Sequence, residues 1–406
     1  MATTNFKNSS GSDLGSFLVE KSYLIDRYPE LVDTFKQAGL WNWGYNGFGI
    51  LGNNTIVNRS SPVQTISASS NWKQVSLGTY HVACIKTDGT LWTWGYNTLG
   101  ALGNNASLDR SSPVQTVSGG TNWKQVSGGG YHTACIKTDG TLWLWGMNTL
   151  GGLGQLGNNA ILPRSSPVQT VSGGTNWKMV ACGDYNTTAI KTDGTLWLWG
   201  NNSYGQLGNN GFLPRSSPVQ TVSGGTNWKM VDCGRYATAA IKTDGTLWLW
   251  GLNDNGQLGD NSFTYKSSPV QTVAGGTNWK QVSCGYYYMA AIKTDGTLWT
   301  WGDGTAGALG DNQTIRKSSP AQTIAGGTNW KQIGAGDFHM SGIKTDGTLW
   351  IWGDNGTGAL GDNSTTIKSS PIQTVASGTN WKMVSCGSSV TSAIRDDSAD
   401  VFGDST

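Results

Sequence analysis

The feature that most constrains the fold is a unit of about 51 residues that is repeated along almost the whole chain. The sequence IKTDGTLWxWG occurs six times, and the short elements NWK and SSP each occur seven times. Successive glycines of the WG dipeptide lie 51 residues apart, except for one interval of 54 and a last one of 50 that ends in VFG. A period near 50 that is built of short extended segments is typical of propeller blades and not of a helical solenoid.

Each unit divides into four expected strands. Strand A is NWKQVSCG, strand B ends in IKTDG with a hairpin turn, strand C is TLWLWG, and strand D is SSPVQTV. The two Trp of strand C, at positions i and i+2, project from one face and are expected to fill the wedge between neighbouring sheets. The Pro of strand D fits an outer edge, where a missing N–H costs little. The sequence therefore predicts an all-β fold, a seven-bladed β-propeller with four-stranded blades.

The repeat resembles a known family. The pattern VSxGxYHxAxIKTDGTLWxWGxNxxGQLG, seen from Val126 to Gly154, is similar to the RCC1-type repeat, and the resemblance covers residues 40 to about 396. It implies a seven-bladed RCC1-like propeller. The family's best-known activity, nucleotide exchange on a small GTPase, belongs to particular members and is not expected here, because the chain has no long β-wedge insertion.

The tryptophan count predicts how the ring closes. Strand C occurs eight times if ADVFGD near the C-terminus is included, but that copy lacks both Trp, whereas the N-terminal LWNWG carries Trp41 and Trp43. Seven blades with three Trp each require 21, which is the whole supply. We therefore expect residues 380–396 to supply strands A and B of the seventh blade and residues 40–66 to supply strands C and D.

Composition limits the classes of partner. The formal net charge of +2 gives no reason to expect nucleic acid or an anionic membrane as a partner. The chain contains no run of 18 apolar residues, so a membrane-spanning helix is not expected. The N-terminus lacks the basic and apolar regions of a secretory signal peptide. Four of the six cysteines share one repeat position and two share another, each held by small or apolar residues in other copies, so free buried thiols are favoured over disulfides.

The strand order predicts two unlike faces. The B–C loops (KTDGT) and the D–A loops (SGGTN) lie on one side and scarcely differ between copies; we call this the constant face. The A–B loops (TYH, GYH, DYN, RYA, YYY, DFH and SSV) and the C–D loops lie on the other side and differ in almost every blade; we call this the varied face. A diversified binding surface explains this contrast, and free drift of loops that pack little is the alternative.

The A–B loops supply the candidate ligand-binding residues. The repeating aromatic residues (Tyr80, Tyr131, Tyr185, Tyr236, Tyr287 and Phe338) suit a recognition surface or sugar stacking, but they could equally wedge between blades. The residues that flank them are therefore the better candidates. They are His81, His132, Asp184, Asn186, Arg235, Tyr286, Tyr288, Asp337 and His339.

No motif predicts catalysis. The three histidines occupy one repeat position, and no residues that could complete a catalytic triad or a metal site accompany them. Neither catalytic residues nor a metal site is therefore expected, and we interpret the chain as a non-enzymatic protein. The GDN sequences could bind Ca²⁺, but Asx turns explain them better. The GxGxxG-like spacings lie between strands and predict no dinucleotide, so no cofactor is expected. The lysines of IKTDG are interpreted as a solvated ring of mixed charge.

The ends of the chain fall outside the repeat. Residues 1–39 are expected to form a flexible polar arm followed by a short helix over YPELVDTFKQAG, with Gly39 as its C-terminal stop. This helix would pack on the propeller rim or dock onto another protein. The expected organisation is thus 1–39 as arm and helix, 40–396 as propeller, and 397–406 as a C-terminal tail.

The N-terminal segment FKNSSGSDLGSFLVEKSYLIDRYPEL is similar to the leading segment of virion structural proteins of marine tailed phages. This resemblance implies a virion protein made in the host cytoplasm, attached to other virion proteins through its arm. We expect the varied face to bind a host-surface glycan or protein. The alternatives are a purely structural virion component without a receptor role and an intracellular protein–protein interaction scaffold; a hydrolase is more remote.

Overall fold

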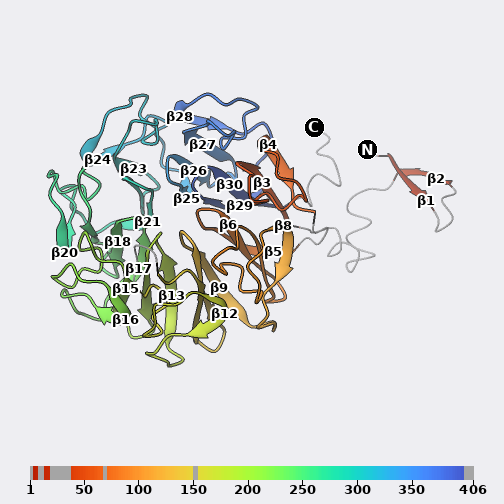
Figure 1. The fold of residues 1–406 in the computed structure, drawn as a ribbon. Helices are drawn as coiled ribbons and strands as arrows, with labels where there is room; N and C mark the ends of the chain where they lie inside the picture. Colours follow the sequence, from red (N-terminus) through yellow and green to blue (C-terminus); the bar gives the residue numbers. More distant parts are fainter. Residues whose placement is uncertain (1–2, 8–12, 19–37, 67–70, 150–153, 397–406) are drawn as a thin grey trace.

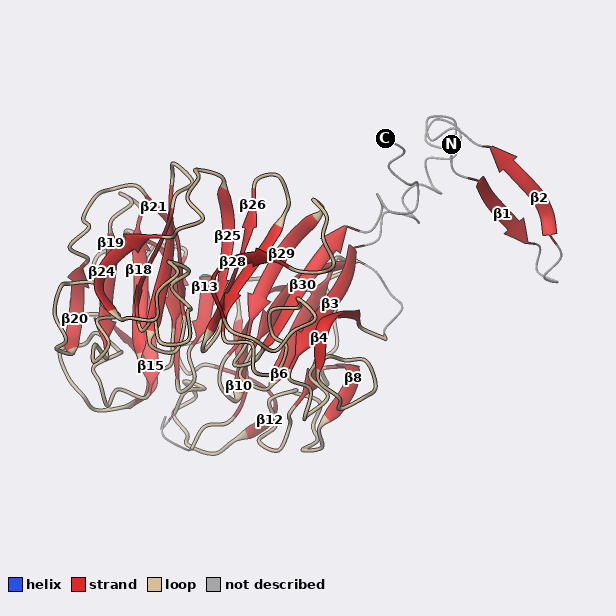
Figure 2. Cartoon of the chain, turned by 90° about the horizontal axis from the view of Figure 1, so that it is seen from above, coloured by secondary structure: helices blue, strands red, loops and turns tan. Residues whose placement is uncertain are grey.

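A computed structural model describes residues 3–7, 13–18, 38–66, 71–149 and 154–396. Seven four-stranded antiparallel sheets are arranged radially around a central channel, with their A strands nearest the centre and their D strands at the rim (Figure 1). In the edge-on view the strands run between two faces covered by loops (Figure 2). This is the seven-bladed propeller that the sequence predicted.

The strands follow the predicted elements. The A strands are β5 (Trp72–Leu77), β9 (Trp123–Gly128), β13 (Trp177–Cys182), β17 (Trp228–Cys233), β21 (Trp279–Cys284), β25 (Trp330–Ala335) and β29 (Trp381–Cys386). The B strands are β6 (His81–Lys86), β10 (His132–Lys137), β14 (Asn186–Lys191), β18 (Ala237–Lys242), β22 (Tyr288–Lys293), β26 (His339–Lys344) and β30 (Val390–Asp396).

The outer half of each blade consists of the C and D strands. The C strands are β3 (Ala38–Gly44), β7 (Leu91–Gly95), β11 (Leu142–Gly146), β15 (Leu196–Gly200), β19 (Leu247–Gly251), β23 (Leu298–Gly302) and β27 (Leu349–Gly353). The D strands are β4 (Arg59–Gln64), β8 (Arg110–Gln115), β12 (Arg164–Gln169), β16 (Arg215–Gln220), β20 (Lys266–Gln271), β24 (Lys317–Gln322) and β28 (Lys368–Gln373).

The seventh blade joins the two ends of the repeat region. Its sheet has the order β29–β30–β3–β4, and β3 pairs with β30 from Ala38 opposite Asp396 to Gly44 opposite Val390. The N-terminal C and D strands thus complete the C-terminal A and B strands, as the tryptophan count led us to expect. The pairing gives β3 and β30 hydrogen-bonded neighbours and removes two open sheet edges.

Tryptophans form much of the core between blades. The second Trp of strand C is fully buried, and in every blade but that of Trp43 its indole N–H donates to a carbonyl of the preceding blade, as Trp94 Nε1 does to Ile50 at 2.6 Å. The Gly of each LGN sequence lies against this ring, because at Gly52, where φ is +62°, a Cβ would come within 2.8 Å of Trp94 Nε1. The first Trp of each pair, such as Trp92, is only half-buried. It packs against the same group of core side chains as Trp94.

The cysteines are free and buried, as predicted. Burial raises the pKa of the Cys182, Cys233 and Cys386 thiols to about 12, so they remain protonated and behave as small core side chains.

The N-terminal segment differs in part from the expectation. The described residues of the predicted flexible arm form two strands, β1 (Thr3–Lys7) and β2 (Asp13–Leu18), which pair antiparallel. Gly39 does not end a helix, because β3 already begins at Ala38 and extends to Gly44. The rest of the predicted helix and the C-terminal tail lie outside the described residues. The described ranges contain strands and loops but no segment that could cross a membrane as a helix.

Candidate ligand-binding face

The three successive positions of each A–B loop have three different environments on the varied face. The first position follows the glycine of strand A and lies near the central channel. The second position carries the repeating aromatic residue and is half-exposed in most blades. The third position begins strand B and is buried in every blade. The candidate residues predicted from the sequence therefore divide between surface and core.

Five candidates occupy the third position and are buried between blades, so they do not belong to the exposed surface of the varied face. They are His81, His132, Asn186, Tyr288 and His339, none of which is more than 1% exposed. A ligand on the surface cannot reach them.

Their contacts are with the next blade. His81 Nε2 lies 2.8 Å from Thr133 Oγ1, and that hydroxyl donates to the carbonyl of Ala101 at 2.8 Å, so the imidazole is the donor to the threonine. Burial lowers the pKa of His81 to about 4, which keeps the ring neutral. Tyr288 Oη lies 2.7 Å from the carbonyl of His339 and 3.0 Å from that of Gly336. These side chains join neighbouring blades.

The remaining four candidates, Asp184, Arg235, Tyr286 and Asp337, come from the first position and stay partly exposed. Asp184, Arg235 and Asp337 lie with Thr79 and Ser388 at the end of the channel that opens on the varied face; we call these five residues the channel mouth. Asp184 Oδ2 lies 3.6 Å from Arg235 Nε, and Thr79 Oγ1 lies 3.4 Å from Asp184 Oδ1. Loops of blades 1, 3 and 4 therefore meet at one carboxylate.

The second blade leaves room for this arrangement. Its first position is Gly130, where a Cβ would come within 2.8 Å of the carbonyl oxygen of Asp184. A larger residue there would displace Asp184 from its contact with Thr79.

The carboxylates of the channel mouth have raised pKa values. Burial raises the pKa of Asp184 to about 7, the nearby Asp337 carboxylate adds to the effect, and the Arg235 guanidinium opposes it. Burial also raises the pKa of Asp337, against hydrogen bonding from Ser388 and the charge of Arg235. Arg235 thus pairs with one acidic group and lowers the pKa of a second through its charge, in a site where the carboxylate charges are costly.

Arg235 also contacts aromatic rings. Its guanidinium carbon lies 4.4 Å from the ring centre of Tyr286, 5.2 Å from that of Tyr236 and 5.6 Å from that of Tyr185. We call these four residues the Arg235 cluster. The three rings favour a positive charge between them.

A second group of aromatic residues surrounds an open hollow over blades 7, 1 and 2. It has a volume of about 460 Å³ and is open to solvent; we call it the aromatic pocket. It is lined by Tyr45, Phe48, Tyr80, Tyr96 and Tyr131 together with Thr79, Ser388, Ser389 and Val390. Phe48 is central, because its ring lies edge-on to Tyr45 at 6.0 Å, Tyr80 at 5.4 Å and Tyr96 at 5.1 Å. All five side chains are half-buried.

Sequence reasoning missed three members of this pocket, Tyr45, Phe48 and Tyr96. They belong to C–D loops, whereas the other two rings belong to A–B loops of neighbouring blades. A signal was present in the sequences YNGF and YNTL, where aromatic residues follow strand C in the blades next to Tyr80 and Tyr131.

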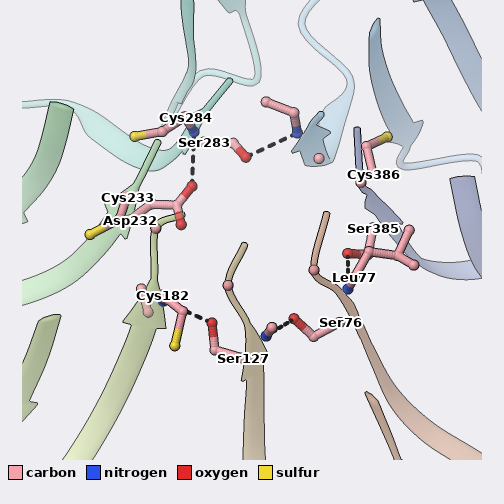
Figure 3. A pocket seen from close by; sticks show the side chains of 18 of the residues that line it. Ser76, Leu77, Ser127, Cys182, Asp232, Cys233, Ser283, Cys284, Ser385 and Cys386 are labelled. Carbon is pink, nitrogen blue, oxygen red and sulfur yellow. Dashed lines mark hydrogen bonds between the residues drawn. The ribbon is translucent and has the colours of Figure 1, made fainter. Parts of the chain in front are cut away.

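The channel below the mouth is lined by the A strands, and polar side chains of its wall form hydrogen bonds to the neighbouring blade. Figure 3 shows side chains of this wall that bond the backbone of the next blade. Ser76 Oγ accepts from the Gly128 N–H at 3.0 Å, and Asp232, at the equivalent position in blade 4, accepts from the Cys284 N–H at 2.8 Å. Burial raises the pKa of Asp232 to about 6. Two blades have no polar side chain at this position of the A strand. In those blades a hydroxyl of strand B contacts the cysteine at the end of the A strand of the next blade, as Thr188 does with Cys233 at 3.2 Å.

The constant face is occupied by contacts within the blades. Lys86 Nζ lies 4.9 Å from the ring centre of Trp72 and 4.3 Å from that of Trp92, so the lysine is clamped between two rings and does not belong to a freely solvated ring of charge. Asp88 accepts from both the N–H and the hydroxyl of Thr90 at 2.9 and 2.7 Å. The same contacts recur in the other KTDGT loops. These contacts give a structural reason for the constancy of the B–C loops.

The Asp residues of the GDN sequences form turns, as expected. Asp260 Oδ1 accepts from the N–H of Ser262 at 3.1 Å and from its hydroxyl at 2.8 Å, which is an Asx turn. Throughout the described ranges, no three His, Cys, Asp or Glu side chains come together as metal ligands.

Comparison with known proteins agrees with this geometry. The family model described as RCC1-like domain matches residues 34–262 and 151–404. The ultraviolet-B receptor UVR8 of Arabidopsis thaliana is 31% identical over 294 residues, which are 70% of this chain and 66% of the receptor. The human E3 ubiquitin-protein ligase HERC2 is 28% identical over 371 residues, 87% of this chain but only 8% of the ligase. The chain thus spans less than two thirds of these relatives.

Among solved structures, Prp20p from Saccharomyces cerevisiae has a TM-score of 0.79 at 17% identity, over 90% of this chain and 94% of that one. The description of that crystal structure concerns binding of Prp20p to Gsp1p and histones. At this identity the likeness shows the shared fold alone.

Proposed function

The chain belongs to the RCC1-like domain family, whose β-propeller is a protein-interaction fold, and we propose that it is a non-enzymatic binding protein with its ligand site on the varied face. The channel mouth is the observation that carries this proposal. Asp184 and Asp337 occupy a loop position where the other blades carry Thr, Gly, Arg, Tyr or Ser, and burial raises the pKa of both carboxyls. Such costly charges beside an open cavity are typical of functional sites.

The contrast in variability between the two faces supports the proposal less than the sequence suggested. The constant loops are held by Lys–Trp and Asp–Thr contacts inside each blade, so their lack of variation needs no further cause. Three charged residues and two aromatic clusters come together on the varied face. This convergence is a separate argument for a binding site there, because the contacts that hold each blade together do not depend on it.

We further propose that the protein is part of a phage particle and that the varied face contacts a host-surface protein or glycan. The similarity of residues 6–31 to leading segments of phage virion proteins supports this placement. The buried free thiols are compatible with assembly in a reducing cytoplasm. Residues 1–39 would provide attachment to other virion proteins.

Two measurements test the proposed function. Mass spectrometry of purified particles should find the chain as a stoichiometric component. Purified chain added to host cells before infection should reduce phage adsorption, because it would occupy the same surface ligand. A chain that is present in particles but never competes with adsorption would be a structural component without a receptor role, and a chain absent from particles would favour an intracellular scaffold.

A further inference from the structure

The varied face carries two aromatic clusters that are built on equivalent positions of different blades. Phe48 and Tyr204 occupy the same position of their C–D loops, and Tyr80 and Tyr236 occupy the same position of the A–B loops that follow. The Phe48 and Tyr80 rings lie 5.4 Å apart, and the Tyr204 and Tyr236 rings lie 4.8 Å apart. The aromatic pocket and the Arg235 cluster therefore share one ring position, held by Tyr80 in the pocket and by Tyr236 in the cluster, and at both places an aromatic residue of the preceding C–D loop contacts that ring.

The two groups differ at the first A–B position, next to the shared ring. In blade 4 the first A–B position is Arg235, whose guanidinium lies over the rings of its cluster. In blade 1 the same position is Thr79, which is short and uncharged and lines the open aromatic pocket. At the position where the cluster has a guanidinium, the pocket therefore has only a short hydroxyl side chain. The loop positions of Tyr185 and Tyr286 are Ser389 and Gly130 in the blades of the pocket, so its other rings come from different loop positions.

Asp184 contacts one residue of each group, Arg235 of the cluster and Thr79 of the pocket. Its Oδ2 lies 3.6 Å from Arg235 Nε, while its Oδ1 lies 3.4 Å from Thr79 Oγ1, on the side of the aromatic pocket. Asp337 is close enough to raise the pKa of Tyr80, after the larger effect of burial. Arg235 is the one cation among the residues that line the mouth and the pocket, and the two carboxyls exceed its charge once both are ionised, which for Asp184 means above about pH 7.

We propose that the aromatic pocket binds the cationic side chain, lysine or arginine, of a protein partner. The inferred contacts are cation–π contacts with Phe48, Tyr80 and the neighbouring tyrosines, and charge pairing with Asp184. This inference rests on the proposed function and names the group that the varied face recognises.

A protein side chain fits the chemistry of the pocket better than a small inorganic cation. Aromatic walls offer contact to the methylene stem of lysine or arginine, whereas an inorganic cation would need several oxygen ligands. The chain already uses this chemistry internally, because Lys86 is held between the rings of Trp72 and Trp92. An acidic group beyond the rings adds the charge complementarity that an exposed cation–π contact alone lacks.

Ligand-observed NMR titration of the purified full-length chain tests this inference. The probes are the Nα-acetyl methylamides of lysine, arginine and norleucine, and free glucosamine. We expect saturable binding of the lysine or arginine probe and at least about fivefold weaker binding of norleucine, which has a similar stem without the charge. Equal binding of norleucine would overturn the role of charge, and tighter binding of glucosamine would overturn the protein side chain as the ligand.

Three variants place the probe in the pocket. Thr79→Arg should supply a cation from the chain itself and abolish probe binding, while Phe48→Leu and Asp184→Asn should each weaken it about threefold or more. Thr294→Ala, an exposed position on the constant face, is the matched control and should bind as the unmodified chain does. Thermal unfolding shows whether each variant is folded. If the lysine and arginine probes fail to bind the unmodified chain, or bind a folded Phe48→Leu/Asp184→Asn double variant unchanged, the inference is wrong.

This outcome can be separated from failure of the proposed function. A chain that blocks phage adsorption but binds none of the cationic probes would retain the binding role and lose the cationic ligand. A chain that binds the probes but does not affect adsorption would retain the cationic ligand and lose the role in host binding.

Discussion

For single residues, the position within the A–B loop decides whether a side chain packs between blades or is exposed on the varied face. Tyr286 and Tyr288 are two positions apart and have the same side chain, yet Tyr286 lies over Arg235 and Tyr288 is 1% exposed. The sequence could not separate them, because both are tyrosines beside the same repeating aromatic position. What separates them is that Tyr288 begins strand β22 and points between blades.

We predict opposite effects for these two tyrosines. Tyr288→Ala removes a buried ring and its hydrogen bond to the next blade, and it should destabilise the propeller by about 3–5 kcal/mol. Tyr286→Ala removes a half-exposed ring and should cost about 1 kcal/mol or less. Urea unfolding of both variants measures the difference, and similar costs would contradict the assignment of the two positions.

Asp232 gives a pH-dependent prediction. Burial raises its pKa in the folded chain to about 6 from an ordinary value of 3.8. The folded state therefore binds this proton more tightly than the unfolded state, and the stability that depends on it falls as pH rises from about 4 to about 6. Serine occupies the equivalent position in four other blades and bonds the next blade without a charge.

The variant Asp232→Ser should therefore gain stability relative to the unmodified chain as pH rises. The difference in melting temperature between the two proteins should be larger at pH 8 than at pH 4.5. Other titrating carboxyls are common to both proteins and largely cancel in this comparison. A difference that is the same at both pH values would show that the Asp232 carboxyl does not titrate as described.

For the strands and loops, the repeat determined nearly everything that could be predicted. Strands A to D were predicted because alternation, the TDG turn and the edge Pro each give a local signal. The structural cause of the constant face was missed, because the clamping of Lys86 between Trp72 and Trp92 joins strands A, B and C of a blade. The three residues lie on three different strands, and the sequence does not show that the lysine stem folds back between the two rings.

The closing strands predict two deletion outcomes. Removing residues 1–66 deletes β3 and β4, leaves β30 with an open edge, and should make the chain aggregate. A soluble product that unfolds cooperatively would contradict the role of β3 and β4 in closure. Size-exclusion chromatography and thermal unfolding measure both properties.

Removing only residues 1–36 should have a different result, because β3 begins at Ala38 and remains whole. This shorter chain should fold and melt as the full chain does, but it should not enter phage particles if the N-terminal segment carries attachment. Particle composition by mass spectrometry measures incorporation. Normal incorporation would instead assign attachment to another surface, such as the constant face.

For the propeller as a whole, ring closure makes a site from loops that are far apart in sequence. Thr79, Asp184 and Asp337 belong to blades 1, 3 and 6 and meet only because all A strands surround one channel. The sequence predicted which loops share the varied face and named Asp184, Arg235, Tyr286 and Asp337. It could not predict their convergence or the pocket around Phe48, because both depend on contacts between side chains of different blades.

The central claim is that the varied face carries the ligand site, and host-cell binding of paired surface variants tests it most directly. Fluorescently labelled chain is titrated onto host cells in three forms: unmodified, Tyr286→Ala/Asp337→Asn on the varied face, and Thr294→Ala on the constant face. Each form is first shown to unfold at a similar temperature. We predict that the double variant binds about tenfold more weakly or worse, as loss of a central aromatic and a charged contact implies, while Thr294→Ala binds as the unmodified chain does. Equal binding of all three forms would contradict the account and leave the varied loops without a recognition role.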